Sequence, residues 1–462
     1  MRCTRKWRAL VALPMLLLTL APTAQETEQP KDNSVVDSAL TRSVRRIADR
    51  LAQVRGEGFD RPPVAIRSPD VMAETVAQAR TYRIIPSQRL ESRGRAWSDV
   101  GLGGTGSAQQ LWIELAADLQ GIDLDAEGQR LLVSPGRLRG EDFGGTTSDR
   151  LIVADGSGGV HEVDVEEGDA AGEVEAMDPQ ARESFLATGV RPDEPILSHY
   201  LIHLRQLERQ RRDSIAETTD ELLAASAWAE GEANLVAVYF LFEGVGLVRT
   251  VLSGPLGPSD LSNGELVPPA VRETDSIHGR LLDFVYEDGY RIAVERFSRG
   301  GWNVFLKDAP RTVRQLRDPN APMPTFSWPE PISPRKEWLL ADSDRLGQQA
   351  ISTLLASWIG IDSLATDAAA GWVDGRLLRW EPAGADGTSD GQTVWQTVWS
   401  SAAQAEQFAS AYTRAVQKRY PQVTIGAEEP DWRVFKSKFR WIRLQQRGNG
   451  VEIVVSSPDP NG

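Results

Sequence analysis

The chain has 462 residues, a formal net charge of −14 and a sequence pI near 5.0. With 41% hydrophobic residues it has ample material for a buried core, so its composition is that of a globular protein. The acidic balance argues against a nucleic-acid partner, because no surplus of Lys and Arg is left to neutralise phosphates.

The first residues have the pattern of a secretory signal peptide, which we place at residues 1–24. A basic segment, Arg2–Arg8, is followed by an apolar run from Ala9 to Leu20, and small and polar residues come next. This run is shorter than the roughly 20 residues that span a bilayer, which favours a cleaved signal over a membrane anchor. We therefore expect an exported protein, periplasmic or extracellular. The single cysteine, Cys3, lies within the signal, so the mature chain should contain neither disulfides nor thiol chemistry.

A polar linker at residues 25–33 leads into a predicted helix-strand-helix unit at residues 34–95. Apolar residues recur every three or four positions in the segment 34–55, which predicts an amphipathic helix. The Pro62–Ile66 stretch predicts a short edge strand, because each proline removes a backbone donor. A second helix is expected through Met72, Val76 and Ala79.

Residues 96–456 form the second predicted domain, which we expect to be α+β and predominantly helical. Alternating apolar residues around a Gly-Ser-Gly-Gly turn predict a β-hairpin over Arg150–Val165. The most apolar mature segment, Ala233–Leu252, contains charged residues and glycines, which favours a core helix ending near Gly244 over a membrane span. A hairpin tip at 383–392 should join two Trp-bearing strands. Further helices are expected at Trp112–Leu119, Arg345–Ala370 and Gln404–Tyr420, and a terminal strand at Val451–Val455.

Two histidines one helical turn apart, His199 and His203, are the main chemical signal. Residues four apart project from one face of a helix, so both imidazoles can reach a single divalent cation. In the HExxH pattern of zinc peptidases the residue after the first histidine is a glutamate that acts as general base, but here it is Tyr200. The spacing alone fits a metal site and also fits two structural histidines.

The candidate third ligand is Glu230. Thr218 and Glu221 predict a capping box that opens a second helix, and Glu230 lies on this helix. A catalytic-type zinc site uses three protein ligands and leaves a fourth position to water. Glu230 also fits a solvated helix residue. The remaining histidines, His161 and His278, have no partner nearby in sequence, and we interpret them as structural.

Several segments follow one another in the order seen in a known family. The sequences HYLIHLRQ at 199–206 and EGEA at 230–233 resemble HELTHALQDQ and EGDA, the signature of exported bacterial and archaeal zinc metallopeptidases of gluzincin type. Collinear segments extend the resemblance from about residue 100 to 420, among them Tyr286–Gly289, Gly300–Trp302, Ala309–Pro319, Leu346–Gln348, Ala369–Gly375 and Trp399–Phe408. The resemblance implies a zincin-like (gluzincin-type) domain with a β-hairpin before the histidine helix. It also implies Zn²⁺ held by His199, His203 and Glu230, and a peptide or protein ligand.

The chain departs from the family pattern at its acidic positions. Tyr200 replaces the catalytic glutamate, and Gln348 and Ser400 stand where the family has carboxylates. A phenol with a pKa near 10 is a poor acceptor of the proton that water must lose, and losing a general base typically costs about 10²–10⁴-fold in rate. Glu232 and Glu194 are the carboxylates that could replace it, although neither lies on the turn between the histidines.

Two functions from different classes therefore remain. The first is a secreted pseudopeptidase that retains the metal ligands and binds a peptide or protein partner without cutting it. The alternative is an active secreted zinc metallopeptidase with a non-standard general base. A structural protein in which the site has decayed is a third reading. The 14 tryptophans could line a ligand groove, but at this density we interpret most of them as core residues.

Overall fold

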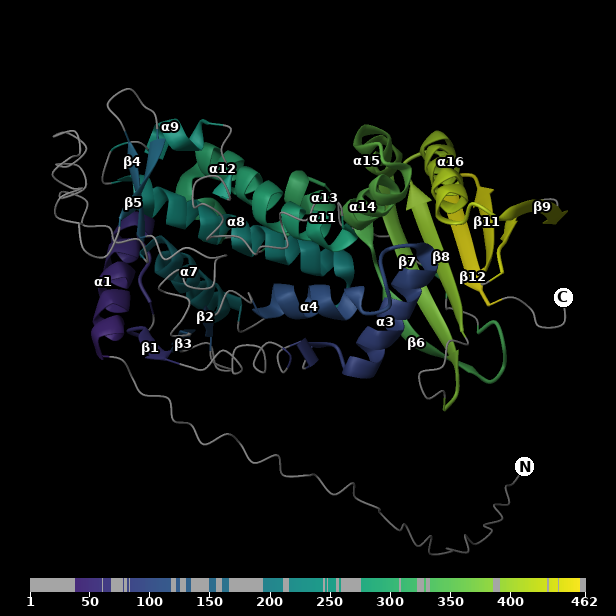
Figure 1. Ribbon diagram of the computed structural model, residues 1–462, viewed down its shortest axis with the longest axis horizontal. Coiled ribbons are helices and arrows are strands. Elements are labelled where there is room, and N and C mark those ends of the chain that lie inside the picture. Colours follow the sequence, from purple (N-terminus) through teal and green to yellow (C-terminus); the bar gives the residue numbers. More distant parts are fainter. Residues whose placement is uncertain are drawn as a thin grey trace, which may run out of the picture. The chain divides into compact units, whose positions relative to one another are not determined.

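The computed structural model describes the chain between residues 38 and 457 (Figure 1). The predicted signal peptide, the linker and most of the predicted helix through Met72 lie outside the described residues. So do residues 60, 68–77, 79–80, 83, 118–121, 125–129, 134–148, 155–159, 166–193, 211–215, 244–245, 247, 255–256, 259–275, 307–308, 322–327, 330–332, 385–390, 430–431 and 439. The predicted boundary between the domains at residues 95 and 96 remains a prediction.

A pair of long helices forms the centre of the helical part. The helix α7 (Glu194–Gln210) packs against α8 (Thr219–Glu243), and α1 (Ser38–Arg55) packs against α7. The helix predicted over 34–55 is thus present from Ser38. The predicted core helix is also present, and α8 ends at Glu243, next to the expected Gly244. Other helices of this part are α4 (Ser107–Ala117), α9 (Val248–Leu252), α11 (Ile277–Asp283), the π-helix η3 (Phe284–Asp288), α12 (Gly289–Gly300), the 3₁₀ helix η4 (Gly301–Leu306) and α13 (Val313–Arg317).

The predicted capping box opens α8. The backbone N–H of Thr218 donates to Glu221 Oε2 over 3.1 Å, and the backbone N–H of Glu221 reaches Thr218 Oγ1 over 3.4 Å. These reciprocal bonds use backbone donors that the first turn of a helix leaves without intrahelical partners. The start of α8, and with it the position of every later residue on this helix, is therefore fixed locally by sequence.

The largest sheet has seven strands in the order β6-β7-β8-β12-β11-β10-β9, and each neighbouring pair is antiparallel. The helices α3, α14 and α16 pack on one of its faces, and α15 packs on α14 and α16 (Figure 1). The bounds are β6 (Trp338–Asp344), β7 (Trp372–Pro382), β8 (Gln392–Trp399), β9 (Thr424–Glu429), β10 (Trp432–Lys436), β11 (Trp441–Arg447), β12 (Gly450–Ser456), α3 (Ser87–Val100), α14 (Gly347–Ile359), α15 (Asp362–Ala370) and α16 (Ala402–Arg419).

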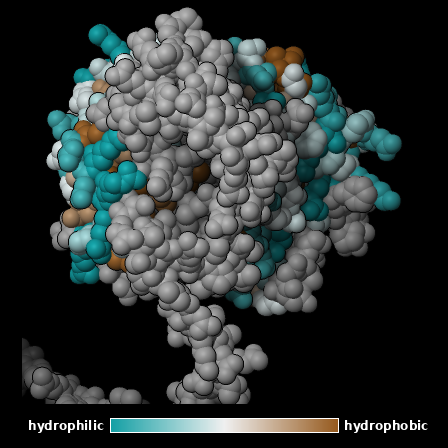
Figure 2. Space-filling model, turned by 60° about the vertical axis from the view of Figure 1, so that its left-hand side comes forward, coloured by the Kyte–Doolittle hydropathy of each residue, from teal (hydrophilic) through white to brown (hydrophobic). Residues whose placement is uncertain are grey.

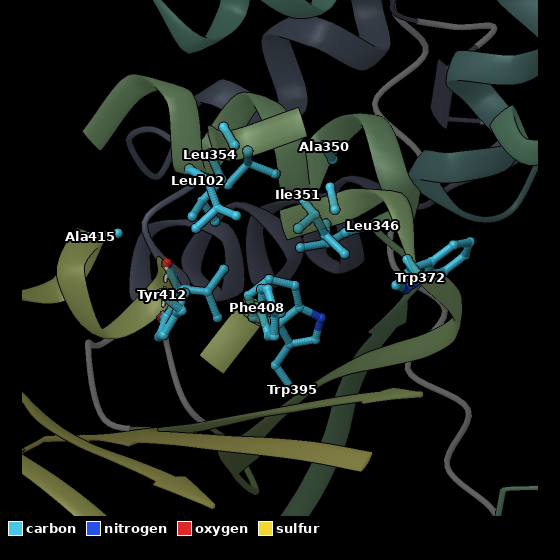
Figure 3. Close-up of a cluster of buried hydrophobic side chains, with 14 of the residues drawn as sticks. Leu102, Leu346, Ala350, Ile351, Leu354, Trp372, Trp395, Phe408, Tyr412 and Ala415 are labelled. Carbon is cyan, nitrogen blue, oxygen red and sulfur yellow. Dashed lines mark hydrogen bonds between the residues drawn. The ribbon is translucent and has the colours of Figure 1, made fainter. Parts of the chain in front are cut away.

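The main hydrophobic core lies between this sheet and its helices. Figure 3 shows Ile351 and Leu354 of α14 near Phe408 and Tyr412 of α16, with Trp395 of β8 below them. The Trp395 and Phe408 rings meet edge to face with centroids 5.5 Å apart, a favoured aromatic geometry. The interpretation of tryptophans as core residues is confirmed for those that are almost fully buried, namely Trp97, Trp112, Trp395 and Trp399.

Two smaller sheets precede the histidine helix. The hairpin predicted over Arg150–Val165 is present as an antiparallel pair of β4 (Asp149–Ala154) and β5 (Val160–Val165). A three-stranded sheet has the order β1-β3-β2, in which β1 is parallel to β3 and lies at an edge, as expected for the strand near Pro62. Its strands are β1 (Val64–Arg67), β2 (Ile122–Leu124) and β3 (Arg130–Val133).

The prediction of a zincin-like, gluzincin-type fold is wrong. The main sheet is built from residues 338–456 and packs on α3, α14 and α16, whereas α7 packs on α8, α1 and the small three-stranded sheet. The physical reason is that HxxxH and EGEA specify a local pair of helices and not the sheet that accompanies it. Short motif segments in the right order therefore do not determine how strands pair over long distances.

No described helix is long and apolar enough to cross a membrane. In the view of Figure 2 the described surface is mostly hydrophilic, with scattered hydrophobic residues. Isolated apolar residues of this kind are normal on protein surfaces. The large apolar side chains exposed among the described residues are Leu306, Leu339, Leu340 and Ile361.

The start of α8 also carries a fully buried carboxylate, Asp220. Its Oδ1 accepts a 3.3 Å bond from the backbone N–H of Val313, and its own N–H donates to the carbonyl of Arg345 over 2.8 Å. A side chain on Gly347 would place its Cβ 1.9 Å from Asp220 Oδ1, so glycine is required there. Burial raises the pKa of Asp220 to about 7, against the lowering effects of the Val313 bond and Arg345.

Asp220 should make stability depend on pH. Its folded-state pKa of about 7 lies above the usual value of 3.8, so the folded protein keeps a proton that the unfolded chain has already lost between these values. Stability should therefore fall as pH rises from about 4 to 7, by at most about 1.4 kcal/mol per pH unit from this group. In Asp220→Asn this part of the slope should disappear in denaturant unfolding at pH 5, 6 and 7. The control is Asp362→Asn, because the side chain of Asp362 is 70% exposed. The assignment would be contradicted if the free energy of unfolding changed with pH by the same slope in Asp220→Asn, in the control and in the wild type.

The close approach of α8 and α12 gives a second prediction. A Cβ on Gly231 would lie 2.3 Å from the carbonyl oxygen of Gly289, a backbone atom that cannot move aside cheaply. Gly231→Ala should therefore destabilise the protein by about 3 kcal/mol, the upper end for overpacked sites. Gly106→Ala is the control, because no atom lies within 4 Å of the added Cβ. Equal unfolding midpoints for the two variants would show that the helices separate easily.

Candidate metal centre

The packing of α7 against α8 brings together the three residues that the sequence singled out. His199 and His203 project from one face of α7, and Glu230 projects from α8. The two Nε2 atoms are 3.0 Å apart, Glu230 Oε2 is 3.4 Å from His199 Nε2, and Glu230 Oε1 is 3.3 Å from His203 Nε2. Within the described part of the chain, this is the group of histidine and carboxylate side chains whose geometry could hold a metal ion.

These separations fit a tetrahedral metal site. Around a zinc ion with bonds of about 2.0–2.2 Å, neighbouring donor atoms lie about 3.3–3.5 Å apart. The two Nε2 atoms, at 3.0 Å, and the shortest contacts of each ring with a Glu230 oxygen, at 3.3 and 3.4 Å, are near this edge length, although the two contacts involve different oxygens of the carboxylate. Glu230 Oε2 is buried, and its contact with His199 Nε2, at 3.4 Å, is long for a hydrogen bond. A cation between the three side chains would satisfy it.

Burial and charge also suit a metal ligand set. His199 is 1% exposed and Glu230 6% exposed, while the side chain of His203 is 14% exposed. Burial alone would raise the pKa of Glu230, but attraction to His203 outweighs it and lowers the pKa to about 2. Glu230 is therefore a carboxylate at neutral pH, which is the form that binds metals.

Tyr200 lies in the hydrophobic core beside the site. It is 2% exposed and belongs to an apolar cluster with Leu197 and Leu201 of α7 and Val236 of α8. Its ring centroid is 5.1 Å from that of His199 and 6.2 Å from that of His203. The position of the missing glutamate is thus filled by an aromatic ring that is held in place by packing and offers no carboxylate.

Of the two carboxylates considered as replacement bases, Glu232 is the one whose side chain the structure describes. Glu232 is 1% exposed, and its two oxygens accept hydrogen bonds from Arg55 and from Gln206. Both oxygens of Glu232 thus already accept a hydrogen bond from a neighbouring side chain. The side chain of Glu194, at the start of α7, lies outside the described residues.

Of the two histidines interpreted as structural, His278 has a side chain that the structure describes. His278 Nε2 pairs with Glu114 Oε2 between α11 and α4, in agreement with a structural role. His161 lies in β5, and its side chain lies outside the described residues.

Sequence reasoning missed the residues that support the ligands from behind. Gln206 Oε1 lies 2.8 Å from His203 Nδ1, and Arg55 of α1 forms a buried ion pair with Glu232. Gln206 follows His203 by three positions, so it shares the histidine face, and this spacing was a usable signal. Arg55 is 177 residues from Glu232, and no local pattern could have linked them.

Comparison with known protein families gives a match that covers the main sheet and does not include the candidate metal centre. Residues 337–461 match a family model described as a domain of unknown function (DUF8575), which covers β6 to β12 and the helices between them. No curated protein and no solved structure matches the chain. His199, His203 and Glu230 all lie before the matched segment, so the chain's similarity to that domain of unknown function is confined to its C-terminal part.

Proposed function

We propose that this is an exported zinc-binding protein, a pseudopeptidase in which His199, His203 and Glu230 hold one Zn²⁺ ion. The observation that carries the proposal is the convergence of the three side chains: the two Nε2 atoms lie 3.0 Å apart, and each lies 3.3–3.4 Å from one oxygen of the Glu230 carboxylate, with one ligand atom from each residue within 4.8 Å of the others. The partly exposed His203 leaves one side of the group open to a fourth ligand. We propose a peptide or protein partner for that side.

The residues around the site favour binding over hydrolysis. A bound zinc ion supplies Lewis-acid chemistry and lowers the pKa of its water toward about 7. The proton must then pass to a base, and the group in the usual position is the phenol of Tyr200, which is 2% exposed. Glu232 is engaged by Arg55 and Gln206. The chain therefore retains candidate ligands for the metal, while the described residues place no carboxylate at the position where the general base of a zinc peptidase would stand.

The secreted setting is part of the proposal. The basic and apolar pattern of residues 1–24 supports export, and the acidic net charge of −14 supports a partner other than nucleic acid. The one cysteine, Cys3, lies in the proposed signal peptide, so the mature chain would not gain stability from disulfides. Metal binding can supply folding free energy in their place, which gives a reason to keep ligands in a protein without peptidase activity.

The first test is zinc stoichiometry and affinity. The purified protein should bind one zinc ion per chain in calorimetry and in elemental analysis. His203→Ala and Glu230→Ala each remove a ligand and should weaken binding by about 100-fold or more. The matched control is His278→Ala, which removes the histidine that pairs with Glu114 away from the site. Zinc binding that is absent in the wild type, or unaffected by loss of His203, would contradict the proposal.

The second test restores the missing base. Tyr200→Glu should raise the rate of peptide hydrolysis over the wild type by about 10²–10⁴-fold if the base is what the site lacks. Because Tyr200 is buried, Tyr200→Gln serves as the control that loses the same ring without gaining a carboxylate. Cleavage of an unstructured protein or a fluorogenic peptide library is the measurement. Efficient, zinc-dependent cleavage by the wild type would instead support the active metallopeptidase with a non-standard base.

A further inference from the structure

We propose that Arg55, acting through Glu232 and Gln206, is a positioning residue that sets the tautomer and orientation of His203 for metal binding. The inference rests on the proposed function, since it concerns the same site. It makes α1, the first described helix, a part of the metal centre. The chain of contacts runs from the end of α1 to a ring on α7 by way of a side chain on α8.

The orientation of the Gln206 amide is fixed by its two acceptors. Its nitrogen lies 2.9 Å from the carbonyl oxygen of Ala229 and 2.8 Å from Glu232 Oε2. The Ala229 carbonyl oxygen and the Glu232 carboxylate oxygen are both hydrogen-bond acceptors. An amide nitrogen has two hydrogens and no available lone pair, so these two bonds use its whole capacity. The amide oxygen must therefore be the atom that faces His203.

This orientation determines which nitrogen of His203 carries the proton. Gln206 Oε1 lies 2.8 Å from His203 Nδ1, and a carbonyl oxygen accepts but cannot donate. Nδ1 is therefore the N–H, and in the neutral ring Nε2 keeps its lone pair. Nε2 is the atom that faces Glu230 and His199. It follows that His199 Nε2–H is the donor in the 3.0 Å contact between the rings of the metal-free protein.

Arg55 holds the other end of this arrangement. Its guanidinium donates to Glu232 Oε1, and both side chains are almost fully buried, at 3% and 1% exposure. Arg55 also lies over the ring of Trp302, with its Cζ 5.1 Å from the centroid, so its position is defined by packing as well as charge. Removing the cation would take away the guanidinium that balances the charge of this buried carboxylate, which is unfavourable. Glu232 would then turn away, and Gln206 would lose the acceptor that fixes its amide.

Support of this kind has a measurable effect on metal sites. Groups that hold the second nitrogen of a ligating histidine typically change metal affinity by about 10–100-fold when they are removed. Most of these groups are direct neighbours of the ring. Here the neighbour of the ring is Gln206, and Arg55 contacts it only through Glu232. The fixed amide of Gln206 transmits the effect of Arg55 to the ring.

The experiment compares Gln206→Leu and Arg55→Met with the wild type in two measurements. Zinc affinity, measured by competition with a chelator, should fall by about 10–100-fold in both variants. The tautomer of His203 should be Nδ1–H in the metal-free wild type, read from the ¹⁵N shifts of the imidazole nitrogens. It should change in both variants. The chain has only 4 histidines, so the spectrum is simple to assign.

Two further variants separate positioning from packing. Arg50→Met removes another arginine of α1, which lies over Phe240 of α8 with its Cζ 4.0 Å from the ring centroid, outside this arrangement. It should leave both the tautomer and the affinity unchanged. Arg55→Lys keeps the charge and should recover part of the affinity lost in Arg55→Met. If Arg55→Met does not fold, Gln206→Leu and Arg55→Lys still test the inference.

The outcomes distinguish this inference from the proposed function. If the wild type binds no zinc, the proposed function fails, while the tautomer measurement still decides whether Gln206 and Arg55 orient the ring. If the wild type binds zinc, and Gln206→Leu binds it equally well with an unchanged His203 tautomer, the inference is overturned and the proposed function stands. Loss of affinity in Arg50→Met equal to that in Arg55→Met would also overturn it.

Discussion

The packing of α7 against α8 is the constraint on which the chemistry depends. It holds a carboxylate of one helix 3.3–3.4 Å from two imidazoles of the other. Three features hold α8 in place: the capping box of Thr218 and Glu221, the buried Asp220, and the close approach of Gly231 to Gly289. Each of them fixes α8 through backbone atoms. The candidate metal centre is therefore a consequence of helix packing, with its three candidate ligands placed on helices and not on loops.

In the proposed function, metal binding is retained without the group that would accept a proton. Glu230 is ionised, and the proposed orientation of Gln206 leaves Nε2 of His203 without a proton, whereas Nε2 of His199 would have to release its proton to a bound metal. Among the described residues, the position that a general base would take is filled by Tyr200, whose ring packs among leucines. Glu232 lies two positions after the candidate ligand Glu230, and it accepts hydrogen bonds from Arg55 and Gln206. A residue that looks like a replacement base in the sequence is therefore, in the structure, part of the support for a ligand.

The sequence predicted what depends on neighbours along the chain. The shared face of His199 and His203, the capping box and the Arg150–Val165 hairpin follow from spacing over a few residues, and the structure has all three. The seven-stranded sheet was missed because its order places β12 between β8 and β11, a pairing that no local pattern specifies. The prediction of a zincin-like fold was wrong for the same reason, because the local motifs do not specify how distant strands pair. Arg55 could not be found because its partner is 177 positions away.

Anomalous diffraction at the zinc edge, from crystals grown with zinc, tests the central claim most directly. The account expects one peak about 2.0–2.2 Å from Nε2 of His199, Nε2 of His203 and an oxygen of Glu230, with Gln206 Oε1 still on His203 Nδ1. It also expects no protein carboxylate beside the fourth position. A zinc ion bound elsewhere, no peak at all, or a carboxylate from another segment beside the ion would contradict the account.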